Sequence, residues 1–316
     1  MTFPTIRIGI GLAAAARPAY ITPARGCDLG GDRAVERLRA RSHALLDAAY
    51  AAGVRYVDVA RSYGLAEDFL AGWLAVRPQA VDVVVGSKWG YRYVGDWRLD
   101  ADVHEVKDHS LDAFRTQYPL SHGLLGERLA IYHLHSLTPD SPALEDRALH
   151  LALARLRASG TRVGFSTSGP DQGEVVRRAL ELEVDGQLLF TSVESTWNVL
   201  EPSAGPALAE AAEAGATVIV KEAVANGRLT PAEDDPHPAA VQARRVAAEL
   251  GAGVDQVATA AALAQPWAWR VLSGAVTIDQ LRANLGATGL DLAQDLTGLA
   301  QPPREYWAQR SARAWA

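Results

Sequence analysis

The sequence predicts an α/β protein folded as one (β/α)8 barrel, the TIM-barrel architecture. Short runs of β-branched and apolar residues alternate with longer stretches of helical period, and this strict alternation implies parallel strands. Eight such repeats within 316 residues fit closure into a barrel. No segment rich in Pro, Gly or Ser divides the chain, so we expect residues 1–316 to form a single domain. An open, doubly wound sheet is the second architecture that the alternation allows.

Eight segments carry the strand pattern, and helical patterns lie between them. The strands are predicted at residues 6–12, 54–59, 81–87, 129–134, 162–166, 188–193, 217–220 and 270–273. The helices are predicted at residues 33–52, 67–76, 142–158, 173–182, 205–214, 239–250, 255–264 and 278–285. Four of them are followed by the glycine that commonly ends a helix: Gly53, Gly160, Gly215 and Gly251.

The stretch at residues 9–14 loosely matches a dinucleotide-binding fingerprint, which would favour the open sheet. A true fingerprint opens a helix whose N-terminus receives the pyrophosphate. Pro18 and Pro23 follow too closely for a regular helix to form there. We therefore interpret this stretch as the first barrel strand running into a loop.

Composition excludes several classes of partner. The chain has 31 basic and 37 acidic side chains, and its net charge of −6 argues against binding to nucleic acid or to an anionic membrane. The only cysteine is Cys27, so we expect no internal disulfide, no thiolate metal site and no metal in the functional site. No apolar run is long enough to span a bilayer, and Arg7 interrupts the one that resembles a signal peptide. These features predict a cytoplasmic protein.

Titratable residues at the carboxyl ends of the strands are candidates for chemistry, because the loops there converge on one opening. Asp58 and Tyr63 follow the second predicted strand, Lys88 the third, and His135 the fourth. Lys88 is notable because only three of the 31 basic residues are lysines. A buried lysine, unlike an arginine, can change its protonation state at an accessible cost.

In order and placement, four side chains resemble the catalytic set of the aldo/keto reductases: Asp58, Tyr63, Lys88 and His135. The resemblance extends over nearly the whole chain and implies hydride transfer between a carbonyl and an alcohol. Tyr63 would exchange the proton, although a phenol with a pKa of about 10 is a poor acid or base at neutral pH. We expect Lys88 to favour the phenolate of Tyr63 and Asp58 to keep Lys88 charged. His135 would hydrogen-bond the substrate oxygen.

A second histidine, His133, lies on the same face of the strand as His135, so alternation does not separate them. The family pattern places His three positions after an aromatic residue, and Tyr132 selects His135. We predict that His133 packs within the barrel, and that His104 and His109 are surface or capping residues. For Asp58 and Lys88 a purely structural ion pair is the alternative role.

The resemblance also implies a nicotinamide cofactor, NADP(H) or NAD(H), with the preference unresolved. The positions that match the family's cofactor-binding segments are Ser166, Thr167, Glu194, Lys221, Glu222, Asn226, Gly227, Gly274, Ala275, Thr277, Gln280 and Asn284. They follow strands 5 to 8 and open the last predicted helix, where backbone amides would receive a phosphate.

Several of these positions depart from the family pattern. Thr167 stands where Asn is usual, and Glu194 replaces an amide-binding Gln, which a carboxylate imitates only as an acceptor. Lys221 replaces the aromatic residue that stacks on the nicotinamide; we expect it to pair with Glu194 or Glu222. Gln280 stands where an arginine would clamp a 2′-phosphate, and Arg282 is a candidate substitute.

A small-molecule carbonyl or alcohol is the expected substrate, and its pocket is predicted to include Tyr20, Trp89 and Trp197. Tyr91 and the pair Tyr306 and Trp307 are further aromatic candidates. Two other functions remain open. A Schiff-base lyase or aldolase could use Lys88 or Lys221 as its amine, and a cofactor-free relative could act as a binding protein. The sequence does not determine the oligomeric state.

Overall fold

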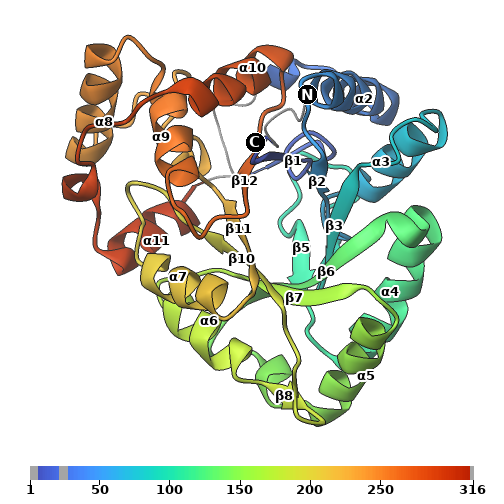
Figure 1. The fold of residues 1–316 in the computed structure, drawn as a ribbon. Helices are drawn as coiled ribbons and strands as arrows, with labels where there is room; N and C mark the ends of the chain where they lie inside the picture. The colour runs from blue at the N-terminus through green and yellow to red at the C-terminus, as the bar shows by residue number, and fades with distance from the viewer. Residues whose placement is uncertain (1–5, 21–27, 314–316) are drawn as a thin grey trace.

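The computed structural model describes residues 6–20 and 28–313, and these residues contain a closed barrel of eight parallel strands. The strands are β1 (Ile8–Gly11), β2 (Tyr56–Asp58), β3 (Val84–Trp89), β6 (Leu129–Leu137), β7 (Arg162–Thr167), β10 (Ser192–Thr196), β11 (Thr217–Lys221) and β12 (Arg270–Ser273). Each pairs with its neighbours in chain order, and β1 closes the ring against β12. Figure 1 shows the strands at the centre and the helices around them. The predicted (β/α)8 barrel is confirmed, and the open sheet is excluded.

Helices cover the outside of the barrel. They are α2 (Val35–Ala51), α3 (Ala66–Ala75), α4 (Leu111–Leu125), α5 (Arg147–Ala158), α6 (Gln172–Leu180), α7 (Gly205–Glu213), α8 (Pro238–Glu249), α9 (Val254–Leu263), α10 (Ile278–Gly286) and α11 (Pro303–Ser311). Short 3₁₀ turns occur at η1 (Gly126–Arg128), η2 (Pro142–Leu144), η3 (Ala225–Gly227), η4 (Ala287–Gly289) and η5 (Thr297–Leu299). Gly53 and Gly160, predicted to end helices, have φ angles of 92° and 103°, a conformation that favours glycine.

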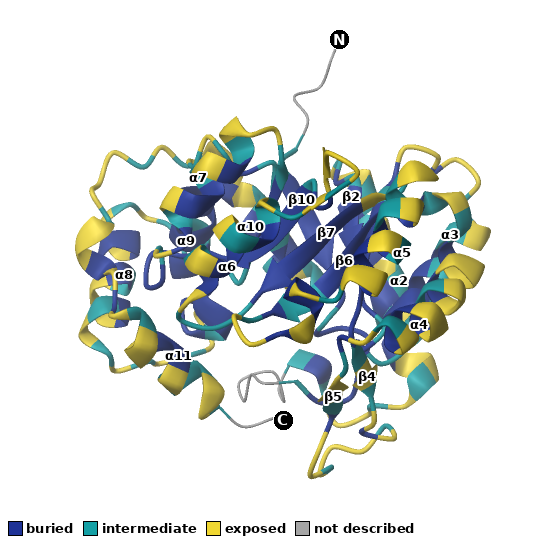
Figure 2. Cartoon of the chain, turned by 90° about the horizontal axis from the view of Figure 1, so that it is seen from below, coloured by how far each residue is buried: buried dark blue, intermediate teal, exposed yellow. Residues whose placement is uncertain are grey.

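Two small antiparallel hairpins lie outside the barrel. One joins β4 (Tyr91–Tyr93) to β5 (Glu105–Lys107), and the other joins β8 (Glu183–Val184) to β9 (Gln187–Leu188). In Figure 2 the β4–β5 hairpin extends from the same end of the barrel at which α11 lies. Among the described residues, no helix combines the length and apolar character needed to cross a bilayer. Cys27 and Pro23 lie outside the described residues.

The sixth strand was predicted about four residues too early, at 188–193 instead of Ser192–Thr196. The apolar run that suggested it, Leu188 to Phe190, belongs to the connection: Leu188 pairs within the β8–β9 hairpin, and Phe190 packs on Phe165. The true strand has the sequence Ser-Val-Glu-Ser-Thr and is fully buried. Polar residues form this strand because some of them face the polar interior of the barrel.

The barrel interior consists of an apolar layer and a polar layer. The apolar layer includes Tyr56, Ile131 and Ile219. Asp58 and His133 stand two residues further along β2 and β6 than Tyr56 and Ile131, and together with Lys88 of β3 and Glu194 of β10 they form the polar layer. Each of these four residues is at most 2% exposed. The strand registers therefore bring two acids, an ammonium and an imidazole together at the carboxyl end of the barrel.

Candidate active site

Lys88 lies at the centre of the polar layer. Its Nζ donates a hydrogen bond to Asp58 Oδ1 and lies 3.1 Å from Glu194 Oε2. Burial opposes the charged form of Lys88, but the two carboxylates outweigh it and raise the pKa of the ammonium well above its usual value. Lys88 is therefore a permanent cation in this site.

His133 also contacts Glu194 and, as expected, is packed within the barrel. Its Nδ1 lies 3.7 Å from Glu194 Oε2, and its Nε2 is 2.9 Å from Ser192 Oγ. Burial lowers the pKa of His133, so the ring is neutral near pH 7. Burial also opposes ionisation of Glu194, but Lys88 and His133 outweigh it and hold the pKa of this carboxyl well below its usual range.

Tyr63 and His135 meet above this layer. Tyr63 Oη lies 3.5 Å from His135 Nε2, at the limit of a hydrogen bond, and Lys88 Nζ lies 5.2 Å from the centre of the Tyr63 ring. The side chain of Tyr63 is 8% exposed, whereas His135 is half-buried. The structure thus brings together all four side chains that resembled the family's catalytic set.

The electrostatics of Tyr63 differ from the sequence-based expectation. Burial raises the pKa of the Tyr63 phenol well above its usual value; Lys88 opposes the rise, but Asp58 and Glu194 add to it. Lys88 therefore acts in the expected direction without making the phenol acidic. Burial, with Lys88 nearby, also lowers the pKa of His135 well below its usual value, so its imidazole is neutral.

His109 and Tyr91 fix the end of β6 that carries His135. His109 Nε2 lies 2.8 Å from the carbonyl oxygen of His135, and its Nδ1 lies 2.7 Å from Ser141 Oγ. The Tyr91 ring packs edge-on at 5.1 Å from the His135 ring. His104 and His109 were predicted to be surface or capping residues; the surface position is wrong, because both are buried, and Ser110 caps α4 instead.

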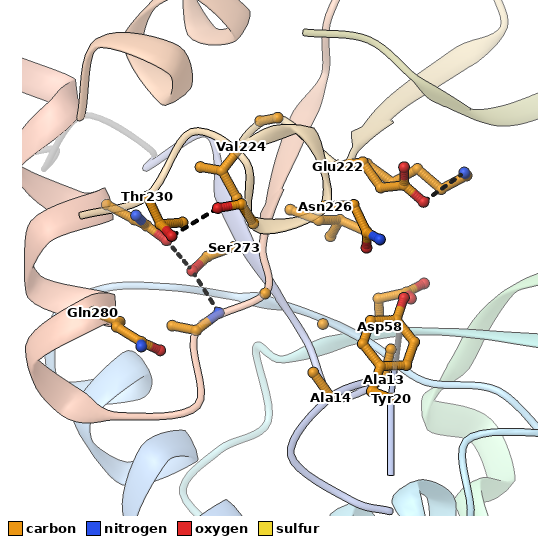
Figure 3. A pocket seen from close by; sticks show the side chains of 18 of the residues that line it. Ala13, Ala14, Tyr20, Asp58, Glu222, Val224, Asn226, Thr230, Ser273 and Gln280 are labelled. Carbon is orange, nitrogen blue, oxygen red and sulfur yellow. Dashed lines mark hydrogen bonds and ion pairs between the residues drawn. The ribbon is translucent and has the colours of Figure 1, made fainter. Parts of the chain in front are cut away.

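A cavity of about 750 Å³ begins at Tyr63 and His135 and extends to the start of α10. In Figure 3, Asp58 and Tyr20 stand on one side of this cavity, and Ser273 and Gln280 stand on the other. Tyr20, predicted for the substrate pocket, lines the cavity together with Tyr91. The cavity is large enough for an extended ligand.

The turn after β11 forms one wall of the cavity, which the predicted residues Lys221, Glu222, Asn226 and Gly227 line. Glu222 and Asn226 have φ angles of 56° and 55°, which few residues other than glycine adopt. Lys221 pairs with Glu222 at 3.6 Å, as one of the two expected pairings, and its Nζ donates to Thr196 Oγ1 at 2.7 Å. Arg310 of α11 makes a bidentate ion pair with Glu222. Burial opposes ionisation of Glu222, but Arg310 and Lys221 outweigh it and lower its pKa to about 2.

The N-terminus of α10 forms the far end of the cavity, which the predicted residues Gly274, Ala275, Gln280 and Asn284 line. Asn284 Oδ1 accepts a hydrogen bond from Ser273 Oγ at 2.7 Å. Thr277 does not line the cavity; its Oγ1 caps the helix by accepting a hydrogen bond from the backbone N–H of Gln280 at 3.2 Å. Gln280 Nε2 donates to Asp28 Oδ2 at 2.7 Å. The candidate substitute Arg282 lies outside the cavity and pairs with Asp279 at 3.0 Å.

Four further residues, predicted to bind the cofactor or the substrate, also lie away from the cavity. Ser166 accepts a hydrogen bond from the Ser136 amide at 2.8 Å, and Thr167 is bonded to Ser195 Oγ at 2.7 Å; both are fully buried. Trp89 packs on Phe114 and Trp197 on Trp267. The two tryptophans are core residues and do not form a substrate pocket. Tyr306 and Trp307 are also buried and absent from the cavity lining.

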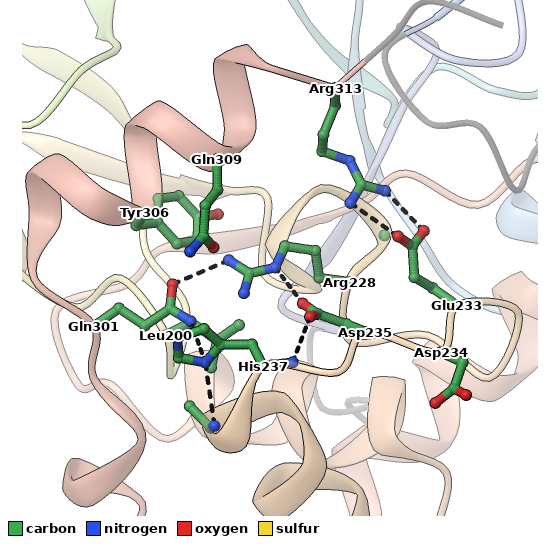
Figure 4. A network of polar contacts seen from close by, with 12 residues as sticks. Leu200, Arg228, Glu233, Asp234, Asp235, His237, Gln301, Tyr306, Gln309 and Arg313 are labelled. Atoms are coloured by element: carbon green, nitrogen blue, oxygen red, sulfur yellow. Dashed lines mark hydrogen bonds and ion pairs between the residues drawn. The ribbon is translucent and has the colours of Figure 1, made fainter.

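Several residues that line the cavity are not among the predicted site residues: Arg17, Asp28, Ser136, Ser168 and Arg310. Ser168 directly follows the predicted residues Ser166 and Thr167, so extending that segment by one residue would have included it. Arg310 reaches the cavity only because α11 packs against the turn after β11. Figure 4 shows the neighbouring contacts: Arg313 pairs with Glu233, and Arg228 pairs with Asp235 and bonds to Gln301. These contacts connect α11 and the preceding segment to the loop after η3.

A sequence model of the aldo/keto reductase family matches residues 30–297, most of the chain. The chain belongs to the aldo/keto reductase family. Membership supports an oxidoreductase that acts between carbonyl and alcohol groups. No curated protein matches the sequence.

Solved aldo/keto reductases share the fold at low sequence identity. An aldo-keto reductase from Bacillus halodurans, in its holo form, is 21% identical with a TM-score of 0.67, over 98% of this chain and 93% of that one. The glycerol dehydrogenase of Gluconobacter oxydans is 19% identical with a TM-score of 0.66, over 98% and 94%. A putative aldo-keto reductase from Pseudomonas aeruginosa is 20% identical with a TM-score of 0.62, over 90% of both chains.

Proposed function

We propose that this protein is an NAD(P)(H)-dependent oxidoreductase that interconverts a small carbonyl compound and its alcohol, with Tyr63 as the general acid and base. The observation that carries the proposal is the position of the Tyr63 hydroxyl, 3.5 Å from His135 Nε2, at one end of a cavity of about 750 Å³. A substrate oxygen in this cavity can contact both groups. The cytoplasmic location and the lack of nucleic-acid and membrane partners stay predictions from composition.

The cavity fits a dinucleotide in shape and in chemistry. It runs from Tyr63 to the N-terminus of α10, a nine-residue helix whose positive dipole end favours a bound anion. A Cβ built on Gly274 would meet no atom within 4 Å, which leaves the backbone open to close approach by a ligand. We propose that the phosphates lie near Gly274 and Ala275 and the nicotinamide near Tyr63 and Lys221. When bound, the reduced cofactor supplies the hydride.

The residues of the chain would divide the remaining work in carbonyl reduction. His135, a neutral imidazole, would donate a hydrogen bond to the substrate oxygen and hold the carbonyl carbon in place. As the carbon receives the hydride, its oxygen gains a negative charge and takes the proton from Tyr63 Oη. The phenolate left behind is stabilised by Lys88. Alcohol oxidation follows the same path in reverse.

A Schiff-base lyase is the second candidate, because burial lowers the pKa of Lys221, which lines the cavity. Lys88 is unsuited to that chemistry, since its two carboxylates keep it protonated. The lowered pKa of Lys221 makes it the amine to test.

The experiment is a titration of the purified protein with NADH and NADPH, followed by quenching of tryptophan fluorescence. The proposal expects saturable quenching and cofactor-dependent reduction of members of a carbonyl panel. Borohydride trapping of a substrate adduct on Lys221, absent in Lys221→Met, would instead establish the lyase. If neither quenching nor trapping is observed, a cofactor-free binding protein is the function that remains.

A further inference from the structure

The ammonium of Lys88 faces two carboxylates rather than one. Asp58 approaches it from β2, and Glu194 approaches from β10 with Oε2 3.1 Å from Nζ. The three side chains are between 0% and 3% exposed, so water screens their charges weakly. Burial, together with the charge of Glu194, raises the pKa of Asp58 well above its usual value although Lys88 opposes the rise, whereas Lys88 keeps Glu194 ionised. Glu194 is therefore the carboxylate that offsets the charge of Lys88.

Among the described residues, Lys88 is the only cation in direct contact with Glu194. His133, on β6, contacts Glu194 but is neutral because burial lowers its pKa. Lys221 of β11 is directed to Thr196 and Glu222 instead.

The groups that face Tyr63 define how this charge balance acts on its hydroxyl. Lys88 lies 5.2 Å from the ring centre, with its two acids behind it, and His135 lies 3.5 Å from the hydroxyl. From the loop after β1, the guanidinium of Arg17 stands 5.1 Å from the centre of the Tyr63 ring and 4.4 Å from that of the Tyr20 ring. Arg17 is itself paired with Glu105. Lys88 is thus the main cation acting on the phenol, and Glu194 reduces its net effect.

We propose that Glu194 keeps the Tyr63 hydroxyl protonated by neutralising the charge of Lys88, which suits this enzyme to carbonyl reduction and makes alcohol oxidation slow even at saturating substrate. Glu194 is a positioning residue in this proposal, because it acts through Lys88. The proposal rests on the proposed function. Reduction needs a phenol: the carbonyl carbon gains the hydride of the reduced nicotinamide cofactor, and the oxygen takes the Tyr63 proton. Oxidation needs the phenolate, which removes the hydroxyl proton of the alcohol as the hydride leaves for the oxidised cofactor.

The direct test replaces Glu194 by glutamine, which keeps the shape and removes the charge. The cofactor-free protein is labelled with ¹³C at tyrosine Cζ, Tyr63→Phe assigns the signal, and NMR follows its titration. In the wild type, the Tyr63 midpoint should lie above that of free tyrosine, about pH 10. In Glu194→Gln it should fall by about one pH unit or more, since a buried like charge is removed.

A matched control is Glu201→Gln, another fully buried acid, whose carboxylate is bonded to Gln172 and Ser203 instead of a lysine. It should leave the Tyr63 midpoint unchanged. In steady-state assays at saturating substrate, Glu194→Gln should lower the pH above which the rate of carbonyl reduction declines. The pH at which the rate of alcohol oxidation reaches its plateau should fall by the same amount.

Two results would overturn the proposal: a wild-type Tyr63 midpoint below that of free tyrosine, or the same midpoint in the wild type and in Glu194→Gln. The first result needs only the wild-type protein, so the proposal can be contradicted even if Glu194→Gln does not fold. The titration uses neither cofactor nor substrate. If the wild type transfers no hydride at all, the proposed function is wrong, whatever the titration shows. The effect of Glu194 on carbonyl reduction would then be wrong as well.

Discussion

At the scale of single residues, charge compensation dominates this site. Lys88, Asp58 and Glu194 are buried together, and each would be costly to bury alone. The same rule holds at the cavity wall, where Glu222 is paired with both Lys221 and Arg310. At the far end of the cavity the charges are less balanced, because the carboxylate of Asp28 contacts only an amide, that of Gln280, among the contacts described.

This imbalance predicts the cofactor preference, given the proposed position of the adenosine end near α10. We expect NADH to bind about tenfold more tightly than NADPH, because Asp28 would repel the 2′-phosphate. Dissociation constants from fluorescence quenching measure it. Asp28→Asn should narrow the difference, and Asp112→Asn, at an exposed position on α4, should not. Tighter binding of NADPH by the wild type would refute the prediction.

At the scale of elements, the sequence predicts the helices and strands whose own residues carry a regular apolar pattern. The four side chains that match the family's set were predicted to lie together because strand order and barrel geometry determine where strand ends meet. The strand Ser192–Thr196 was misplaced because its residues face a polar layer and lack the usual apolar signature. Trp89 was assigned to the pocket because the sequence does not show that α4 packs against it through Phe114. The role of α11 was also missed, since a long-range ion pair, Arg310 with Glu222, brings it to the cavity.

The Glu222–Arg310 pair predicts how the attachment of α11 depends on pH. The pKa of Glu222 is about 2 in the folded protein and its ordinary value is 4.5, so the carboxylate stabilises the fold above that ordinary value. This contribution, roughly 3 kcal/mol near pH 7, is lost as the pH falls from about 4.5 towards 2.

Urea unfolding at several pH values measures this effect. Glu222→Gln should be less stable than the wild type at pH 7, and the difference should shrink below about pH 4.5. Glu305→Gln, a half-exposed acid on the same helix, should change the free energy of unfolding by less than about 0.5 kcal/mol. A Glu222→Gln deficit that stays constant down to pH 3 would argue against the pairing.

At the scale of the whole molecule, barrel closure places the site. The polar layer draws residues from strands that lie far apart in sequence, and only the closed ring brings Asp58 of β2 near Glu194 of β10. Close backbone approaches make this packing possible. At Gly164 an added Cβ would stand 2.1 Å from the backbone oxygen of Ser192 and 2.8 Å from the His133 ring.

Gly164→Ala should therefore destabilise the barrel by roughly 2 kcal/mol or more, because a backbone oxygen cannot move aside without disturbing β10. Thermal or urea unfolding measures it. Gly123→Ala is the matched control: it lies in α4, where an added Cβ meets nothing within 4 Å, and should be neutral or gain about 0.5 kcal/mol. Equal stability of the two variants would contradict the packing described for the polar layer.

The most direct test of the whole account is the rate of hydride transfer in a single turnover of Tyr63→Phe, followed by the absorbance of the reduced cofactor. Removing one hydroxyl should slow carbonyl reduction by a factor on the order of 10² to 10⁴ and leave the cofactor dissociation constant nearly unchanged. Transfer at the wild-type rate in Tyr63→Phe would show that another group supplies the proton, and the assignment of this site would then be wrong.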